Sequence, residues 1–324
     1  MKSIILTAIT LFFSSNLYSQ NELDYKSLRG KVKTLVETVT YRIADTDELD
    51  SNVTKFSFTI GGDLLAYENY YHDLISNSLH NDYDSRGIIS KEIKFNKSDN
   101  LATITEMNQL GKPWRVWKAR NNEKPTLWIE NIYDKRGNIS HYKIMNSQGS
   151  EITPNNSKYD DQNRVIETVY RNSLGDLVEH KYTSAYDDAG RISETNFYIN
   201  NKLDSKTTYE YDNAGRLIKE NIWNEAYKDN KSVIKTYNDL GHLTEMRSRD
   251  YGGREINKKY ISDKYGNITK EESSGGYGGD SILESNYTYD KTGNWIKKEQ
   301  YRSGGRRNLE KELYTIHTRA ISYY

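Results

Sequence analysis

The sequence predicts an all-β fold, an antiparallel meander of about ten β-hairpin repeats that forms an extended or curved, mostly single-layer sheet. Three observations lead to this prediction. A turn motif recurs about every 26 residues, which is the scale of one supersecondary unit. Apolar residues make up only 35% of the 324 residues, too few for one large core. Aromatic residues nevertheless reach 12%, whereas disordered chains are poor in aromatics.

Residues 1–20 have the layout of a secretory signal peptide. The basic residue Lys2 precedes a mostly apolar run over residues 4–13, which is followed by a short polar stretch. This run is too short to span a bilayer, which takes about 20 helical residues. We expect cleavage after Ser19 or Gln20 and a mature protein without a membrane span, exported to the periplasm, the cell surface or the extracellular space.

The rest of the chain divides into two parts. Residues 21–55 form an N-terminal segment with the first strand, and residues 56–324 form the repeat array. Within the first part, residues 31–43 read as a strand because β-branched residues recur at alternate positions. The acidic residues 45–50 are expected to form the loop that follows.

The repeated motif is a tight turn, as in Tyr186-Asp187-Asp188-Ala189-Gly190. Asp or Asn at the first turn position and Gly at the fourth are typical of a type I turn. A glycine with positive φ then ends the turn in a G1 bulge and closes a β-hairpin. The fourth position is Asn163 in one copy, and Asn also tolerates positive φ. The residues assigned to this structural role include Asp84, Gly87, Asp134, Gly137, Asp187, Gly190, Asp212, Gly215, Gly241, Asp290 and Gly293.

In such a hairpin the residue before the Asp faces the residue two after the Gly. In most copies the first of these is Tyr and the second is aliphatic, as for Tyr211 and Leu217. Pairs of this kind contribute about 0.2–1 kcal/mol each over Ala pairs. The copy with Met107 and Pro113 is the weakest. Ten flat units would extend about 100 Å, so the low apolar content favours a sheet that curves.

The ten in-phase motifs, from about Phe56 to the C-terminus, resemble the YD repeat, also called the RHS repeat, of bacterial secreted and surface proteins. In that family long arrays spiral into a hollow shell around a toxin, and some members are associated with carbohydrate binding. The resemblance therefore implies a repeat scaffold with a glycan partner. This array is short, with neither a toxin module nor a self-cleavage segment after it, so a complete shell is not expected.

Trp114, Trp117 and Trp128, together with Arg115, form the densest aromatic and cationic cluster of the sequence. Aromatic faces and guanidinium groups suit sugar rings and protein hot spots, so these residues are the candidate binding site. The other interpretation is that the tryptophans fill a sheet face where the regular tyrosine pattern fails. Both interpretations remain open at this point.

One stretch matches the calcium-binding nonapeptide pattern. It covers residues 275–283 and makes Asp280 a weak metal candidate. A calcium β-roll needs successive copies to complete each ion's oxygen shell, and the sequence has one, so a glycine-rich turn is the favoured interpretation. Otherwise no metal site is expected, because the 6 His residues lack ligand spacing and the chain has no Cys.

Charge and motifs narrow the function. Lys plus Arg and Asp plus Glu each number 46, so the zero net charge gives no electrostatic case for nucleic acid. The sequence has no zinc-protease helix, nucleophile elbow or phosphate loop, so we expect neither an enzyme nor a cofactor. The predicted function is an exported, non-enzymatic repeat scaffold that presents an extended face to a carbohydrate or a protein. The alternative is a structural shell or spacer that pairs with another repeat protein through its terminal strands.

Overall fold

The computed structural model describes residues 28–42, 48–121, 123–146, 149–154, 156–171, 179–276, 278–305 and 309–324. The signal peptide expected at residues 1–20 lies outside them. They form one antiparallel sheet of 23 strands, which confirms the predicted all-β meander. The strands are β1 (Val32–Arg42), β2 (Leu49–Phe58), β3 (Leu64–Tyr71), β4 (Leu74–Tyr83), β5 (Ile89–Asn96), β6 (Leu101–Met107), β7 (Pro113–Arg120), β8 (Thr126–Tyr133), β9 (Ile139–Asn146), β10 (Gly149–Pro154), β11 (Asn156–Tyr159), β12 (Val165–Arg171), β13 (Glu179–Tyr186), β14 (Ile192–Ile199), β15 (Lys202–Tyr211), β16 (Leu217–Asn224), β17 (Asp229–Tyr237), β18 (Leu243–Arg249), β19 (Glu255–Ser262), β20 (Ile268–Gly275), β21 (Ser281–Tyr289), β22 (Trp295–Gly304) and β23 (Leu309–Tyr323).

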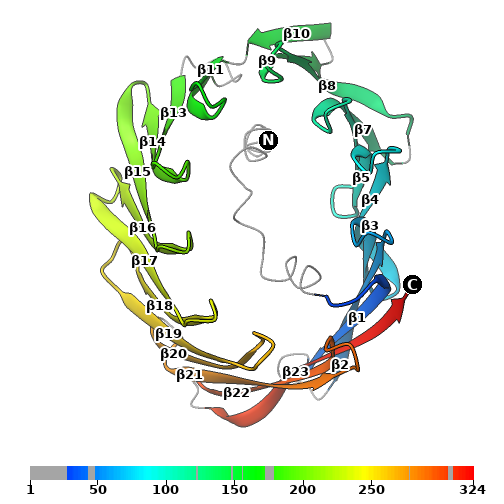
Figure 1. Ribbon diagram of the computed structural model, residues 1–324, viewed down its shortest axis with the longest axis vertical. Coiled ribbons are helices and arrows are strands. Elements are labelled where there is room, and N and C mark those ends of the chain that lie inside the picture. Colours follow the sequence, from blue (N-terminus) through cyan, green and yellow to red (C-terminus); the bar gives the residue numbers. More distant parts are fainter. Residues whose placement is uncertain are drawn as a thin grey trace.

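The sheet curves until its two ends meet, so the strands follow a nearly closed ring (Figure 1). β1 pairs with β2 along one edge and with β23 along the other, from Val32 opposite Tyr323 to Tyr41 opposite Thr315. Both edges of β1 and of β23 are therefore paired within the described ring. The expectation that the terminal strands pair with another repeat protein is wrong, because they pair with each other.

The ten tight turns share one hydrogen-bond pattern and one register. At the turn between β13 and β14, the Gly190 N–H donates to the Asp187 carbonyl over 2.8 Å, and Gly190 has φ 78°. Asn163 takes the same position with φ 65°. Each turn is followed by a β-bulge that sets the predicted cross-strand pair, as Tyr186 opposite Ile192. The cross-strand pairs in the other turns are Phe58–Leu64, Tyr83–Ile89, Met107–Pro113, Tyr133–Ile139, Tyr159–Val165, Tyr211–Leu217, Tyr237–Leu243, Ser262–Ile268 and Tyr289–Trp295.

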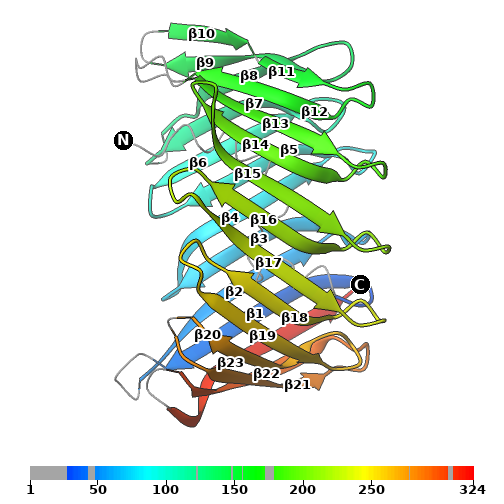
Figure 2. The same cartoon turned by 90° about the vertical axis from the view of Figure 1, so that its left-hand side faces the viewer.

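The two kinds of turn lie at opposite ends of the ring. β13, β15 and β17, each of which leads into a tight turn, point to the same end (Figure 2). The looser connections lie at the other end. This segregation follows from the antiparallel meander, in which the two turn types alternate along the chain.

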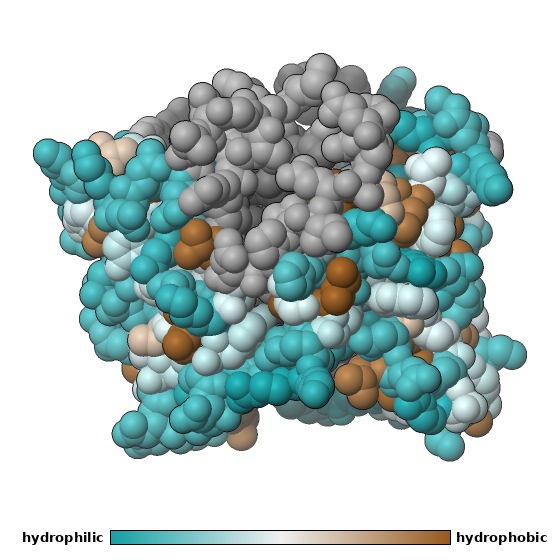
Figure 3. All heavy atoms as spheres, turned by 90° about the horizontal axis from the view of Figure 1, so that it is seen from above, coloured by the Kyte–Doolittle hydropathy of each residue, from teal (hydrophilic) through white to brown (hydrophobic). Residues whose placement is uncertain are grey.

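Little of the ring is buried, as expected for a single layer. Among the described residues six hydrophobic side chains are buried, and three of them, Val32, Leu35 and Phe58, form one cluster where β1, β2 and β23 meet. On the surface in Figure 3, hydrophobic residues are scattered among hydrophilic ones. A ring of this many strands is wider than one layer of side chains can fill. The best-packed hydrophobic contacts are thus those that close the ring. Partly buried residues that pack against the cluster are Leu28, Phe56, Leu64 and Ile321.

The ladder of strands is interrupted once, between β10 and β11. β10 pairs with β9 over residues 149–154, and β11 pairs with β12 over residues 156–159. Every other described strand is hydrogen-bonded to a neighbouring strand on both of its edges. Pro154 is the last residue of β10, at the split, and proline has no N–H to donate to a second neighbour. At the tight-turn end the Asn138 and Asn163 amides exchange hydrogen bonds of 2.6 and 3.0 Å across the split.

Candidate functional site

The predicted tryptophan cluster lies on β7 and β8, which are neighbours in the sheet. Trp114 is 39% exposed. The Arg115 guanidinium lies 4.0 Å from the centre of its ring, and Glu130 holds that guanidinium through contacts of 2.9 Å from Nε and 2.8 Å from Nη2. Trp114, Arg115 and Glu130 therefore form a connected group, with the cation fixed beside the exposed ring.

The other two tryptophans lie on opposite faces of the sheet. Successive residues of a strand point to opposite faces, so Trp117 lies on the face of Arg115 and Lys118 on the other. The Lys118 ammonium lies 3.1 Å from the centre of the Trp128 ring, which places Trp128 on the face of Lys118. Burial, together with repulsion from Arg120, lowers the pKa of Lys118. The cluster is therefore two groups, and spacing in the sequence could not separate them.

A column of residues that the sequence reasoning missed links several repeats to the next. It is the residue directly after the turn glycine. Arg191 donates through Nε to the Asp187 carboxylate over 2.7 Å, and its guanidinium lies 4.5 Å from the centre of the Tyr211 ring in the next repeat. The Tyr211 hydroxyl in turn donates to the Ile192 carbonyl over 2.9 Å. We call this Asp, Arg and Tyr arrangement the repeat clamp.

The repeat clamp recurs in the neighbouring turns. Arg164 lies 4.2 Å from the Tyr186 ring centre, and Arg216 lies 4.8 Å from that of Tyr237. The signal was present in the sequence, since the three arginines stand at the same position of aligned repeats. The contact was not predicted because the Asp and Tyr residues had already been explained by roles within their own hairpins. The sequence of a single repeat does not show which residues contact the next repeat.

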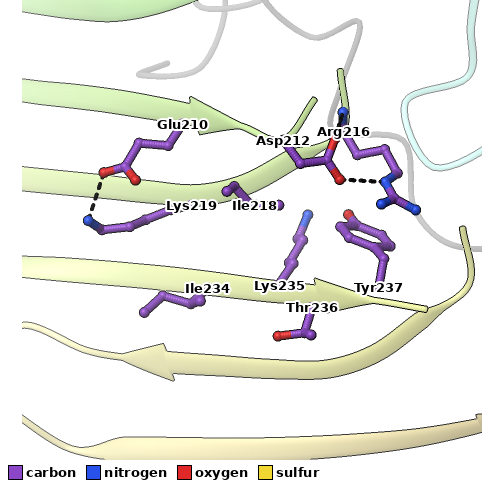
Figure 4. A pocket seen from close by; sticks show the side chains of 9 residues that line it. All are labelled: Glu210, Asp212, Arg216, Ile218, Lys219, Ile234, Lys235, Thr236 and Tyr237. Carbon is purple, nitrogen blue, oxygen red and sulfur yellow. Dashed lines mark hydrogen bonds and ion pairs between the residues drawn. The ribbon is translucent and has the colours of Figure 1, made fainter. Parts of the chain in front are cut away.

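A shallow pocket of about 380 Å³ borders the clamp of Arg216, between β15 and β17. Figure 4 shows Arg216 between the Asp212 carboxylate and the Tyr237 ring. The Asp212 carboxylate accepts hydrogen bonds of 2.9 Å from the Arg216 N–H and 2.6 Å from its Nε, and these lower the pKa of Asp212. Glu210 pairs with Lys219 over 2.7 Å. A carboxylate whose pKa is lowered by such contacts, as that of Asp212 is, is a poor general base.

The calcium candidate Asp280 serves the loose turn before β21. Its Oδ1 accepts the Gly275 N–H over 3.1 Å, while Tyr277 of the nonapeptide lies outside the described residues. In the described part of the chain, no three His, Asp or Glu side chains gather as metal ligands.

Millimolar calcium should therefore leave the melting temperature unchanged, because one nonapeptide cannot complete an oxygen shell. Thermal melts with added CaCl₂ and with EDTA check this expectation. A rise of several degrees that EDTA reverses would contradict it.

Among known proteins, only solved structures show a similarity to this chain. No family model and no curated protein matches this sequence. A porin-like protein from Bacteroides uniformis is 10% identical over 91% of this chain and 99% of that chain, with a TM-score of 0.34. The TcdB2–TccC3–Cdc42 crystal structure is 10% identical over 86% of this chain, with a TM-score of 0.32. This chain spans only 19% of that one. In the described residues no helix has the length and apolar composition needed to cross a membrane.

Proposed function

We propose that this protein is an exported, non-enzymatic scaffold whose ring presents a carbohydrate-binding face centred on Trp114. The observation behind the proposal is the exposed Trp114 ring beside an Arg115 guanidinium that Glu130 holds in place. An aromatic ring stacks on the apolar face of a sugar, while a fixed guanidinium and carboxylate offer a donor and an acceptor to its hydroxyl groups. Because both charges are already paired, the group is ordered before a ligand arrives, which lowers the entropic cost of binding.

Binding is favoured over catalysis by the engagement of the acidic residues. The turn carboxylates accept backbone and guanidinium hydrogen bonds, as Asp187 does from Arg191, and are thereby committed to structure. The proposed site needs neither a metal nor a cofactor.

Replacing Trp114 with Ala should weaken glycan binding at least tenfold, because the stacking surface is removed. The ligand is first identified on a glycan array and its affinity then measured by titration calorimetry. Trp128→Ala is the matched control, since Trp128 lies on the neighbouring strand and contacts Lys118, whereas Trp114 contacts Arg115. We expect its affinity to be unchanged. Loss of binding in Trp128→Ala but not in Trp114→Ala would move the site to the Lys118 and Trp128 pair.

The ring itself supports a second candidate, a stand-alone structural shell. Pairing of β1 with β23 gives a nearly closed framework whose terminal strands need no partner to cover them. The glycan array separates the two functions. A shell alone binds no glycan, whereas the first proposal requires a ligand that depends on Trp114.

A further inference from the structure

The first and last segments that the structure describes, residues 28–32 and 323–324, meet in a geometry that matches the tight turns. Tyr323 lies opposite Val32, and a bulge follows between Val32 and Thr34. Tyr289 lies opposite Trp295 in the same way, next to its own bulge. The residue two positions before Val32 is Gly30, with φ 79°, as the glycine two positions before Trp295 has φ 89°.

The backbone hydrogen bonds agree with this correspondence. The Tyr324 N–H donates to the Lys31 carbonyl over 3.0 Å. In the covalent turns the N–H of the turn aspartate donates to the carbonyl of the residue after the glycine. The Asp290 N–H donates in this way to the Asn294 carbonyl over 2.8 Å. Tyr324 thus occupies the aspartate position, and Lys31 occupies the position after the glycine.

The contacts to the preceding repeat also match. The Asn294 amide donates to the Tyr323 hydroxyl over 2.8 Å, just as the Asn267 amide donates to the Tyr289 hydroxyl over 2.8 Å. In both repeats the hydroxyl also bonds to the carboxylate that opens the turn. Asn294 further exchanges hydrogen bonds with the Arg29 backbone, of 2.6 and 2.8 Å. Tyr323 therefore takes the position that Tyr289 has in the last covalent turn, directly before the turn aspartate.

We propose that residues 28–32 and 323–324 form an eleventh repeat turn that is split between the two ends of the chain. β23 and β1 are then the two strands of its hairpin, held without a covalent connection. All other hydrogen-bonded neighbours in the described ring are joined by a connecting segment, so β23 and β1 are the pair of strands held by non-covalent contacts alone. β23 binds β1 along its edge, through the strand pairing and side-chain hydrogen bonds described above. This inference does not rest on the proposed glycan site.

The first test compares substitutions of Gly30 in the full chain. Gly30→Val should lower the melting temperature by several degrees, because a β-branched residue is strained at positive φ. Gly30→Asn should lower it much less, because Asn163 holds the same turn position with φ 65°. Gly215→Val and Gly215→Asn, in a covalent turn, are the matched controls and should show the same order. Equal losses for both Gly30 variants would show that crowding alone acts there, and would overturn the proposal.

The second test is a circular permutant that makes the eleventh turn covalent. Tyr324 is joined directly to Leu28, with Tyr324→Asp so that the joint follows the Tyr-Asp-x-x-Gly pattern. The new ends lie between Ala226 and Tyr227, in the connection from β16 to β17, and residues 1–27 are kept at the new N-terminus. We expect a β-type circular dichroism spectrum and a melting temperature at least equal to that of the parent.

A control permutant carries an eight-residue Gly-Ser linker between Tyr324 and Leu28 in place of the direct joint. If only the permutant with this linker folds, the ends are close but do not form a turn. If neither permutant folds, the contact between β23 and β1 is not equivalent to a hairpin. Either result would overturn the proposal.

Discussion

Glu37→Gln should lower the free energy of unfolding by about 3 kcal/mol, because it leaves a buried guanidinium without its counter-charge. The Arg319 side chain is 1% exposed and that of Glu37 is 16% exposed. Arg319 donates to the Glu37 carboxylate over 3.0 Å from Nε and 2.9 Å from Nη2. It also lies 3.3 Å from the Trp295 ring centre, so one side chain links β1, β23 and β22. Urea unfolding followed by circular dichroism measures the loss.

The matched control is Glu210→Gln, which breaks an ion pair of similar length at the surface. The Glu210 side chain is 56% exposed, and it pairs with Lys219 over 2.7 Å. Exposed pairs contribute about 0–1 kcal/mol. A loss in Glu37→Gln no greater than in Glu210→Gln would show that the buried pair does not hold the ring closed.

The same pair predicts how stability depends on pH. Burial opposes ionisation of Glu37, but hydrogen bonds from His317 and Arg319, together with the Arg319 charge, outweigh it and lower the pKa of Glu37 below its ordinary value of 4.5. A carboxyl group whose pKa is lowered by folding stabilises the fold above its unfolded-state pKa, and this contribution is lost as the pH falls through the folded-state pKa. The difference in melting temperature between the parent and Glu37→Gln should therefore be full at pH 7 and shrink below pH 4.5. A difference that persists unchanged in acid would contradict this assignment.

Deleting one whole repeat, residues 190–214, should leave a soluble protein that melts cooperatively. The deletion removes β14 and β15 and joins Ala189 to Gly215, which restores an intact turn between β13 and β16. Arg216 then takes the place of Arg191 beside Asp187, so the repeat clamp is also restored. Stability should fall only by roughly one repeat and its interface, as in nearly one-dimensional arrays. Thermal melts and size-exclusion chromatography measure the outcome.

Deleting half a repeat, residues 190–201, should instead cause aggregation. This change removes one turn and β14, and joins Ala189 to Lys202. β13 and β15 point to the same end of the ring (Figure 2), and parallel neighbours need a crossover of about a dozen residues, which the variant lacks. The direction of every later strand would also be reversed relative to the strands before the deletion. Similar behaviour of the two deletions would show that the period of about 26 residues is not the structural unit.

The candidate site could be predicted only in part. Proximity of Trp114, Trp117 and Trp128 in space follows from their places on one hairpin, which spacing suggests. The division of Trp117 and Trp128 between two faces depends on the contact of Lys118 with Trp128, next to a bulge where β7 meets β8. A bulge shifts the register by one residue. This bulge does not follow a tight-turn motif, so the sequence does not predict it.

The sequence by itself determined the turns and the register of the hairpins. The reason is that their chemistry is local, as the Asp187 carboxylate bonds to a backbone N–H only four residues away. Ten repetitions of such a local code also determined the meander and its single layer.

The tertiary structure alone decided that the array closes. Curvature is the sum of small rotations between many neighbouring strands, and no single motif encodes the total. The closing turn has one half at Gly30 and the other at Tyr323, almost a full chain apart, so a search for contiguous copies cannot find it. The Glu37–Arg319 pair likewise joins residues 282 positions apart. Such contacts exist only once the sheet has turned far enough for its first and last strands to meet.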